Sequence, residues 1–271
     1  MSNSVLYSLV FLAYVGLAIY FWRVQITGGS DALNRGVVGH WVILPLTLHA
    51  YLLYGNLLGG GGLNLGLIYA LSSILWLTML VYWVARLFYP ITSLQTLVLP
   101  LAALGALLPA LFPATATPPA NPISLALQAH VLAAMFAYSL LTIAALHAGL
   151  MSLVEKHLHH ATLPRMLRGL PPLLTMEILL FRILWAGFIL LTLTLISGMV
   201  FSEQLFGQPW KLNHKTFFGF ISWSVFAVLL LGHHFRGWRG RTAVHWTMSG
   251  FVFLILAYLG SKFVVEVLLG R

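Results

Sequence analysis

The stretch Leu125–Lys156 constrains the fold of this chain more than any other segment. It reads LALQAHVLAAMFAYSLLTIAALHAGLMSLVEK and is longer than the roughly 20 apolar residues that a helix needs to cross a bilayer. His130 lies about a turn and a half from its start, and His147 lies near its end. An ionisable side chain inside a membrane helix is costly, so His130 is a candidate functional residue. His147, near the end of the span, is expected to be structural.

The composition of the chain is that of an integral membrane protein. Of its 271 residues, 60% are hydrophobic and only 7% are charged, which is too few charged side chains for the surface of a soluble domain. Apolar runs near twenty residues favour helices over the roughly ten-residue strands of a membrane barrel. The chain has no cysteine, which excludes disulfides, thiolate metal sites and covalent CxxCH haem. Its eleven histidines are therefore the main candidate ligands.

The hydropathy pattern predicts an all-α polytopic membrane protein, a bundle of about eight transmembrane helices in one integral membrane domain, residues 1–271. The expected spans are Val5–Trp22, Val37–Tyr54, Leu65–Leu87, Leu94–Phe112, Leu125–Lys156, Glu177–Phe201, Thr216–His234 and Thr242–Val265. The fourth span contains Pro100 and Pro109, and proline interrupts helical hydrogen bonding. We therefore expect that span to be kinked or short.

The basic residues alternate between the two sides of these spans. The loops after odd-numbered spans carry Arg23, Arg35, Arg86, Lys156, Arg165, Arg168, Arg236, Arg239 and Arg241. Short basic loops stay in the cytoplasm, so both termini are predicted on the outer, periplasmic side. This topology also accounts for the net charge of +9, so the lipid bilayer is the expected partner and nucleic acid is not.

Two histidines lie at equal predicted depth below the outer surface. His49 comes about six residues before the outer end of the second span, and His130 about six residues after the outer start of the fifth, so both are roughly 9 Å deep. Helix bundles build cofactor sites from such inward side chains. In a chain without cysteine, the natural candidate cofactor is bis-histidine haem b. The alternative is that each ring only hydrogen-bonds a neighbouring carbonyl or hydroxyl group.

Other histidines are candidates at the two ends of the spans. His214, in the outer loop, is either an outer metal ligand or a solvated loop residue. His233 and His234 end the seventh span at the inner face. Adjacent helical residues point about 100° apart, so only one of these two can face the bundle. The sequence leaves open which one does.

Three cations are candidate partners for an anionic group. Arg236 and Arg239 follow His233 and either anchor the inner face or clamp a carboxylate such as a haem propionate. Lys262, near the outer end of the eighth span, either pairs with Glu266 one turn later or reaches an anion. No Walker loop, HExxH or partnered GxSxG motif is present, so no catalytic residue is nominated and the sequence favours a role that is not enzymatic.

Six segments carry a family resemblance: LTLHAY, LQAHVLAAMFAYSLLTIAAL, PPLLTMEILLFR, LLTLTLISGMVF, GHHFRGWRGR and LAYLGSKFV. Together they make the chain resemble the cytochrome c assembly family (CcsA/CcmC-like), and most closely its YpjD/HemX-like branch. The resemblance implies eight spans in the bacterial inner membrane with both ends outside. It also implies a haem-ligand role for His130 at the outer side and for His233 at the inner end. His49 matches the second-span histidine of the branch.

The resemblance implies a haem-binding protein that holds or passes haem b within or across the membrane, with apocytochrome c machinery or a membrane protein as partner. Arg236, Arg239 and Lys262 would then contact the propionates. The outer loop FGQPWKLNHKT keeps Trp210, a candidate for cofactor binding, but lacks the family's WGxxWxWD pattern. This difference favours haem binding over presentation of haem to apocytochrome.

Two alternatives to a haem-handling protein stay open. One is a non-catalytic accessory or regulatory subunit without haem, in tetrapyrrole regulation or beside an ion-transport protein. The other is a b-type cytochrome that exchanges electrons with quinone. Such a cytochrome usually needs two stacked haems and therefore four well-placed histidines, a pattern that is not evident in this sequence.

Overall fold

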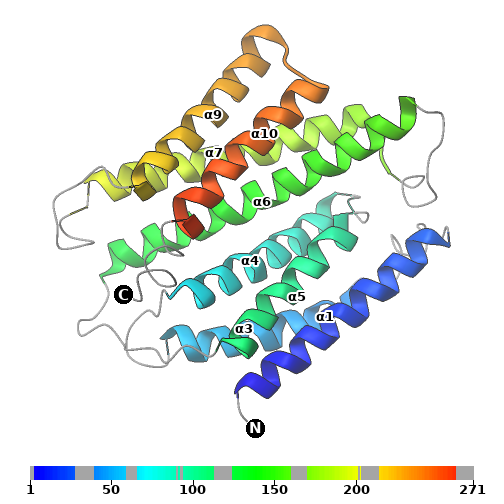
Figure 1. Ribbon diagram of the computed structural model, residues 1–271, viewed down its shortest axis with the longest axis vertical. Helices are drawn as coiled ribbons and strands as arrows, with labels where there is room; N and C mark the ends of the chain where they lie inside the picture. Colours follow the sequence, from blue (N-terminus) through cyan, green and yellow to red (C-terminus); the bar gives the residue numbers. More distant parts are fainter. Residues whose placement is uncertain are drawn as a thin grey trace. The chain divides into compact units, whose positions relative to one another are not determined.

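The computed structural model describes residues 3–27, 40–58, 66–89, 91, 94–112, 124–159, 170–200, 202 and 214–260 (Figure 1). Its elements are α1 (Asn3–Ile26), α3 (Ile43–Leu58), α4 (Leu67–Phe88), α5 (Gln95–Leu111), α6 (Leu125–His159), α7 (Leu173–Val200), α9 (His214–Arg236), α10 (Gly240–Ile255) and the π-helix η4 (Leu256–Gly260). Within these ranges there is no strand, so the all-α prediction is confirmed.

Each expected span overlaps one α-helix of the described residues. Five of the helices are long and apolar enough to cross a membrane, namely α1, α4, α6, α7 and α9. The helix of the fourth span, α5, is short and contains Pro100 and Pro109, as expected. The helix of the sixth span begins earlier than predicted, at Leu173, directly after Pro171 and Pro172. A helix starts readily after proline because its first N–H groups need no helical partner.

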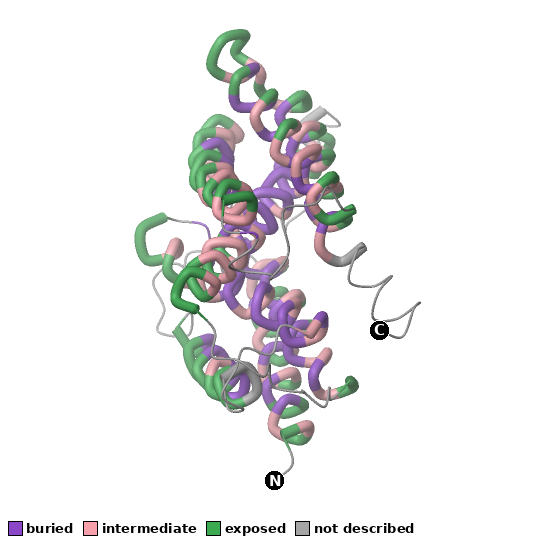
Figure 2. The backbone as a smooth tube through the Cα atoms, turned by 90° about the vertical axis from the view of Figure 1, so that its left-hand side faces the viewer, coloured by how far each residue is buried: buried purple, intermediate pink, exposed green. Residues whose placement is uncertain are grey.

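The chain divides into two compact units. The first comprises residues 1–122 and 154–172, and its helices α1, α3, α4 and α5 each pack against two of the others. Gly105 lets α5 approach α4 closely, because a Cβ atom there would lie 2.9 Å from the Cβ atom of Leu75. Buried and exposed positions alternate along the helices, as expected for helices that turn one face inward and the other toward lipid (Figure 2).

The second unit comprises residues 123–153 and 173–271, with most of α6, all of α7, α9 and α10, and η4. The start of α6 contacts the end of α7 through His130 and Ser197. The start of α7 contacts the end of α9 and the start of α10 through Phe181 and Glu177. Successive helices of this unit therefore run in opposite directions, as a chain that crosses a membrane repeatedly must.

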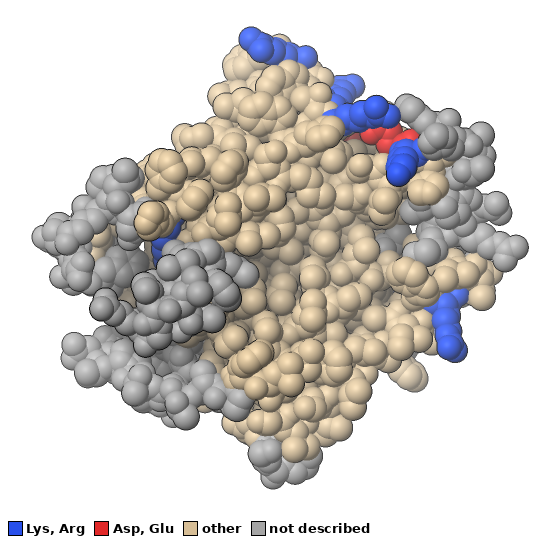
Figure 3. Space-filling view, viewed as in Figure 1, with Lys and Arg blue, Asp and Glu red and all other residues tan. Residues whose placement is uncertain are grey.

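Charged side chains are sparse on the described surface (Figure 3). The last turns of three helices carry basic residues, namely Arg23 in α1, Arg86 in α4 and Arg236 in α9. These helices are odd-numbered spans, after which basic residues were predicted. A cation at a helix C-terminus is favourable in itself, since the helix dipole places partial negative charge there. The same positions are where cytoplasmic basic residues are expected, and the side of the membrane on which the termini lie stays a prediction.

Candidate functional site

His130 is held in one orientation by α7. Its Nδ1 atom lies 2.8 Å from the Ser197 hydroxyl, and that hydroxyl donates its own proton to the carbonyl of Thr194 at 3.1 Å. Because a serine hydroxyl has one proton, His130 Nδ1–H must be the donor in the first bond. The lone pair of the neutral ring therefore lies on Nε2. A hydrogen bond of this kind at the other ring nitrogen is what orients metal-binding histidines.

Gly198 makes room for the His130 ring beside α7. The His130 side chain is half-buried on the first part of α6. Gly198 lies beside it on α7, where a Cβ atom would come 3.3 Å from the His130 Cε1 atom. The absence of a side chain at Gly198 thus lets the imidazole lie against α7 with its Nε2 edge turned away from Ser197.

His49 is also oriented by a serine, but it is fully enclosed. Its Nε2 atom lies 3.1 Å from the Ser72 hydroxyl of α4, and it is buried completely. Tyr7 and Tyr14 of α1 contact the ring edge-on, each with ring centroids 6.0 Å from that of His49. Among the described residues, neither His49 Nδ1 nor the Tyr14 hydroxyl has a hydrogen-bond partner. One ring nitrogen of His49 is therefore hydrogen-bonded, and the other is buried without a hydrogen-bond partner among the described residues.

The predicted ligands His49 and His130 belong to different compact units. Their pairing on a single iron stays a prediction. His147, predicted to be structural, lies buried on α6 with its Nε2 atom 2.8 Å from the carbonyl of Met176. Within the described part of the chain, no group of three or more His, Cys, Asp or Glu side chains is placed so that it could hold a metal ion.

Lys215 is a candidate that the sequence reasoning did not single out. It follows His214, the exposed first residue of α9, and its ammonium group lies 5.6 Å from the ring centroid of Tyr258. Its place in the NHKT segment, at the same predicted end as His130, is the signal that could have identified it. The predicted residues Lys262 and Trp210 lie outside the described residues.

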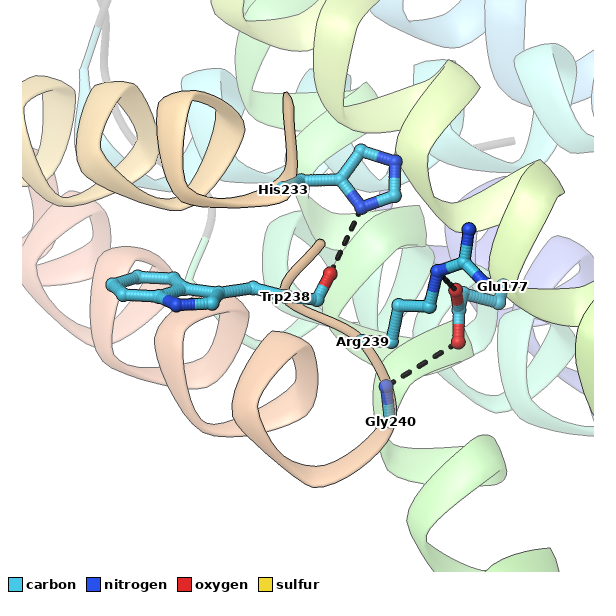
Figure 4. Close-up of polar contacts among 5 residues, drawn as sticks. All are labelled: Glu177, His233, Trp238, Arg239 and Gly240. Carbon is cyan, nitrogen blue, oxygen red and sulfur yellow. Dashed lines mark hydrogen bonds and ion pairs between the residues drawn. The ribbon is translucent and has the colours of Figure 1, made fainter. Parts of the chain in front are cut away.

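At the opposite end of the second unit, the structure distinguishes His233 from His234. The His233 Nδ1–H donates to the backbone carbonyl of Trp238 at 2.8 Å, which places the lone pair of the neutral ring on Nε2 (Figure 4). The ring stacks on Phe181 of α7, with centroids 3.5 Å apart and planes inclined by 15°. His234 is exposed. His233 is therefore the histidine that faces the bundle.

The turn that follows α9 is fixed by its glycines. Gly237 and Gly240 have φ angles of 64° and 53°, a left-handed conformation that side chains other than glycine rarely adopt. The Gly237 N–H donates to the carbonyl of His233 at 3.1 Å, which caps α9, and the Trp238 N–H donates to the carbonyl of Gly232 at 3.2 Å. This geometry brings the Trp238 carbonyl back to the His233 ring.

Glu177 ties the same turn to α7. One carboxylate oxygen accepts the Gly240 N–H at 3.3 Å, and the other lies 3.4 Å from Arg239 Nε (Figure 4). Arg239 is 64% exposed whereas Glu177 is 13% exposed, so the carboxylate is the sheltered partner. Arg236 is exposed. Of the two predicted carboxylate-binding arginines, Arg239 thus has an acidic partner that sequence reasoning missed.

The chain matches known proteins along most of its length. A family model described as cytochrome C assembly protein matches residues 37–269. The inner membrane protein YpjD of Escherichia coli K12 is 36% identical over 139 residues, which are 51% of this chain and 52% of that protein. The cytochrome c biogenesis protein CcsA of Prochlorococcus marinus MIT 9515 is 36% identical over 88 residues, which are 32% of this chain and 28% of that protein.

The alignments with the two relatives cover only part of each protein. The aligned region spans about half the length of the YpjD relative and less of the CcsA relative. No solved structure matches the chain. The family model nevertheless covers all of the expected spans from the second onward, and the chain has multiple apolar helices. The chain therefore belongs to the cytochrome c assembly protein family, as a multi-pass membrane protein of the YpjD-like branch.

Proposed function

We propose that the protein binds haem in the bacterial inner membrane and holds it there or passes it within or across the membrane. The observation that carries this proposal is the orientation of the His130 ring and the position of its lone pair. Ser197 fixes the ring through Nδ1 because its own proton goes to Thr194, so the lone pair of the neutral ring lies on Nε2. A neutral imidazole prepared in this way is a suitable axial ligand for haem iron.

His233 would supply a second ligand position, at the inner end of the unit. The carbonyl of Trp238 holds its Nδ1–H, so the same nitrogen, Nε2, carries the lone pair. Arg236 and Arg239 lie within the next few residues and would contact propionates there. Bound haem would supply an iron whose oxidation state can change. The protein's own residues would orient that iron and neutralise the carboxylates.

His49 fits a ligand role through a different nitrogen. Its unsatisfied Nδ1 is a buried polar atom, and burying such an atom without a partner costs roughly 1–3 kcal/mol. Iron at Nδ1 would remove that cost. Tyr7 and Tyr14 surround the ring, so a haem at this position would have to displace their contacts. We keep His49 as the proposed second outer ligand, and the spectra described below test it.

The topology is part of the same proposal. Eight crossings with both termini on the outer side would place His130, His214 and Lys215 near the periplasm, and His233 near the cytoplasm. The basic last turns of α1, α4 and α9 support this orientation. Apocytochrome c machinery or another membrane protein would then be the partner that gives or takes the haem, consistent with the names of the matched relatives.

An absorption spectrum of the detergent-purified full chain tests the proposal. The protein would be expressed with adequate haem supply and examined oxidised and then reduced with dithionite. We expect a Soret band and sharp reduced α and β bands, because two imidazoles make haem iron low-spin. The bands should weaken in His49→Ala if His49 is an axial ligand.

A colourless protein that also fails to take up added haem would contradict the proposal. That result would favour the accessory or regulatory subunit without haem, and the protein should then co-purify with a partner. A coloured protein whose spectrum is unchanged in His49→Ala would refute the role of His49 alone.

A further inference from the structure

We propose that Phe181 closes the His233 site to a planar porphyrin, so that the phenyl ring must move away before haem reaches His233. The inference rests on the proposed function, in which His233 is the second ligand position. It adds the residue that decides when this position is open. We refer to Phe181 and Glu177, which lie one helical turn apart on α7, as the α7 closure.

Phe181 covers one face of the His233 ring. The ring centroids are 3.5 Å apart and the planes are inclined by only 15°. Carbon atoms in van der Waals contact are themselves about 3.5 Å apart. A centroid distance of the same size means that the two rings lie directly over each other, with almost no sideways offset. The six-membered ring of Phe181 is wider than an imidazole, so its rim reaches at least as far as the His233 Nε2 atom.

A porphyrin bound at Nε2 would overlap this rim. Nε2 lies on the edge of the ring turned away from the Trp238 carbonyl (Figure 4). A metal ion lies about 2 Å from an imidazole nitrogen that binds it, and the plane of a porphyrin is perpendicular to that bond. The macrocycle would therefore pass about 2 Å from the rim of Phe181, where carbon atoms need about 3.5 Å. A proton can reach Nε2 beside Phe181, but a macrocycle cannot.

Glu177 holds Phe181 in this position. Phe181 is buried at 5% exposure, and interiors are closely packed, so its ring can leave His233 only if the surrounding helices move. One carboxylate oxygen of Glu177 accepts the Gly240 N–H at 3.3 Å, which joins the start of α7 to the start of α10 (Figure 4). Opening the His233 site therefore requires the aromatic stack and this hydrogen bond to yield together.

The closure would make access to the inner position the controlled step. When only an open form of a protein binds a ligand, the apparent affinity is reduced by the fraction of molecules that are open. The intrinsic affinity of the His233 imidazole for iron would be unchanged by Phe181. Removing the phenyl ring should therefore strengthen haem binding, whereas an ordinary core truncation should leave it unchanged or weaken it.

Haem binding by Phe181→Ala tests the closure. Ferric haem is titrated into the detergent-purified full chain, and binding is followed by the Soret absorbance. We expect Phe181→Ala to bind haem about fivefold more tightly than the wild type, the size of one lost aromatic stack, and to bind it faster. The gain should disappear when His233→Ala is added, because it arises at that ring. Phe181→Val, which keeps more of the core packing, should show the same gain if Phe181→Ala does not fold.

Phe188→Ala is the matched control. Phe188 lies on the same helix, but its ring stacks on Trp223, with centroids 5.6 Å apart, and not on a histidine. The substitution removes the same side chain from α7 and should leave haem affinity unchanged. An equal gain in Phe188→Ala would show that loosening α7 is sufficient, which would overturn the specific role of Phe181.

The outcomes separate the two proposals. Haem binding that is unchanged or weaker in both folded Phe181 variants, or a gain that survives His233→Ala, would overturn the closure and leave haem binding intact. Failure of the wild type and of every variant to bind haem would overturn the proposed function, and the closure with it.

Discussion

Replacing Gly232 with leucine should destabilise the second unit by about 3 kcal/mol. A Cβ atom at Gly232 would overlap the indole ring of Trp238. The indole cannot easily move, because the Trp238 N–H is bonded to the Gly232 carbonyl, its own carbonyl accepts from His233, and its ring lies 5.3 Å from that of Trp246. The substitution must therefore break the turn or force α9 and α10 apart.

Thermal unfolding in detergent, followed by circular dichroism, measures this effect. Gly16→Leu is the matched control, since Gly16 lies on an exposed position of α1 with no atom within 4 Å of an added Cβ. Leucine also has a higher helix propensity than glycine, so the control should not lower the melting temperature. Equal melting temperatures for the two variants would show that Trp238 does not lie over Gly232 as described.

Glu177→Ala should lower the free energy of unfolding by about 2 kcal/mol, mostly because the backbone N–H of Gly240 in α10 loses its acceptor. The carboxylate accepts the Gly240 N–H at the first residue of that helix, where charge-assisted bonds and the helix dipole favour an anion. The bond to Arg239 should add little, because that guanidinium is 64% exposed and exposed pairs contribute roughly 0–1 kcal/mol. Arg239→Ala should therefore cost less than 1 kcal/mol.

Unfolding of the two single variants and the double variant in denaturant gives the coupling energy between Glu177 and Arg239. Glu177→Gln serves as the conservative control, since its amide oxygen can still accept the Gly240 N–H and should recover part of the loss. An Arg239→Ala cost as large as that of Glu177→Ala would show that the ion pair, and not the bond to α10, holds the turn.

The helices could be predicted from the sequence, but the sequence did not show which helices pack against one another. Length and hydropathy alone located the eight α-helices of the described residues, because a membrane span must be long and apolar. Because such a span is apolar, hydropathy does not show which face of the helix packs against other helices. His233 and His234 could not be ranked because they are adjacent at the end of one span, and only contacts made in the folded chain, such as the stack of His233 on Phe181 and its bond to the Trp238 carbonyl, distinguish them.

The hydrogen-bond partners of the candidate site residues could not be predicted from the sequence either. Ser197 lies 67 positions from His130 in the chain, and Glu177 lies 63 positions from Gly240. Such distant pairs leave no periodic signal in one sequence. The contact between Lys215 and Tyr258 could not be predicted either, because the π-helix that carries this ring has no recognisable sequence pattern. The chemistry-bearing histidines were found because an ionisable residue in a membrane span is conspicuous by itself.

The central claim is that His130 Nε2 binds haem iron, and imidazole rescue of His130→Gly tests it most directly. The haem spectrum of the purified variant is recorded before and after addition of imidazole. The account predicts that low-spin bands are lost in the variant and return when imidazole occupies the space left by the side chain, next to Ser197 and Gly198. A His130→Gly protein that keeps the full wild-type spectrum without imidazole would contradict the claim.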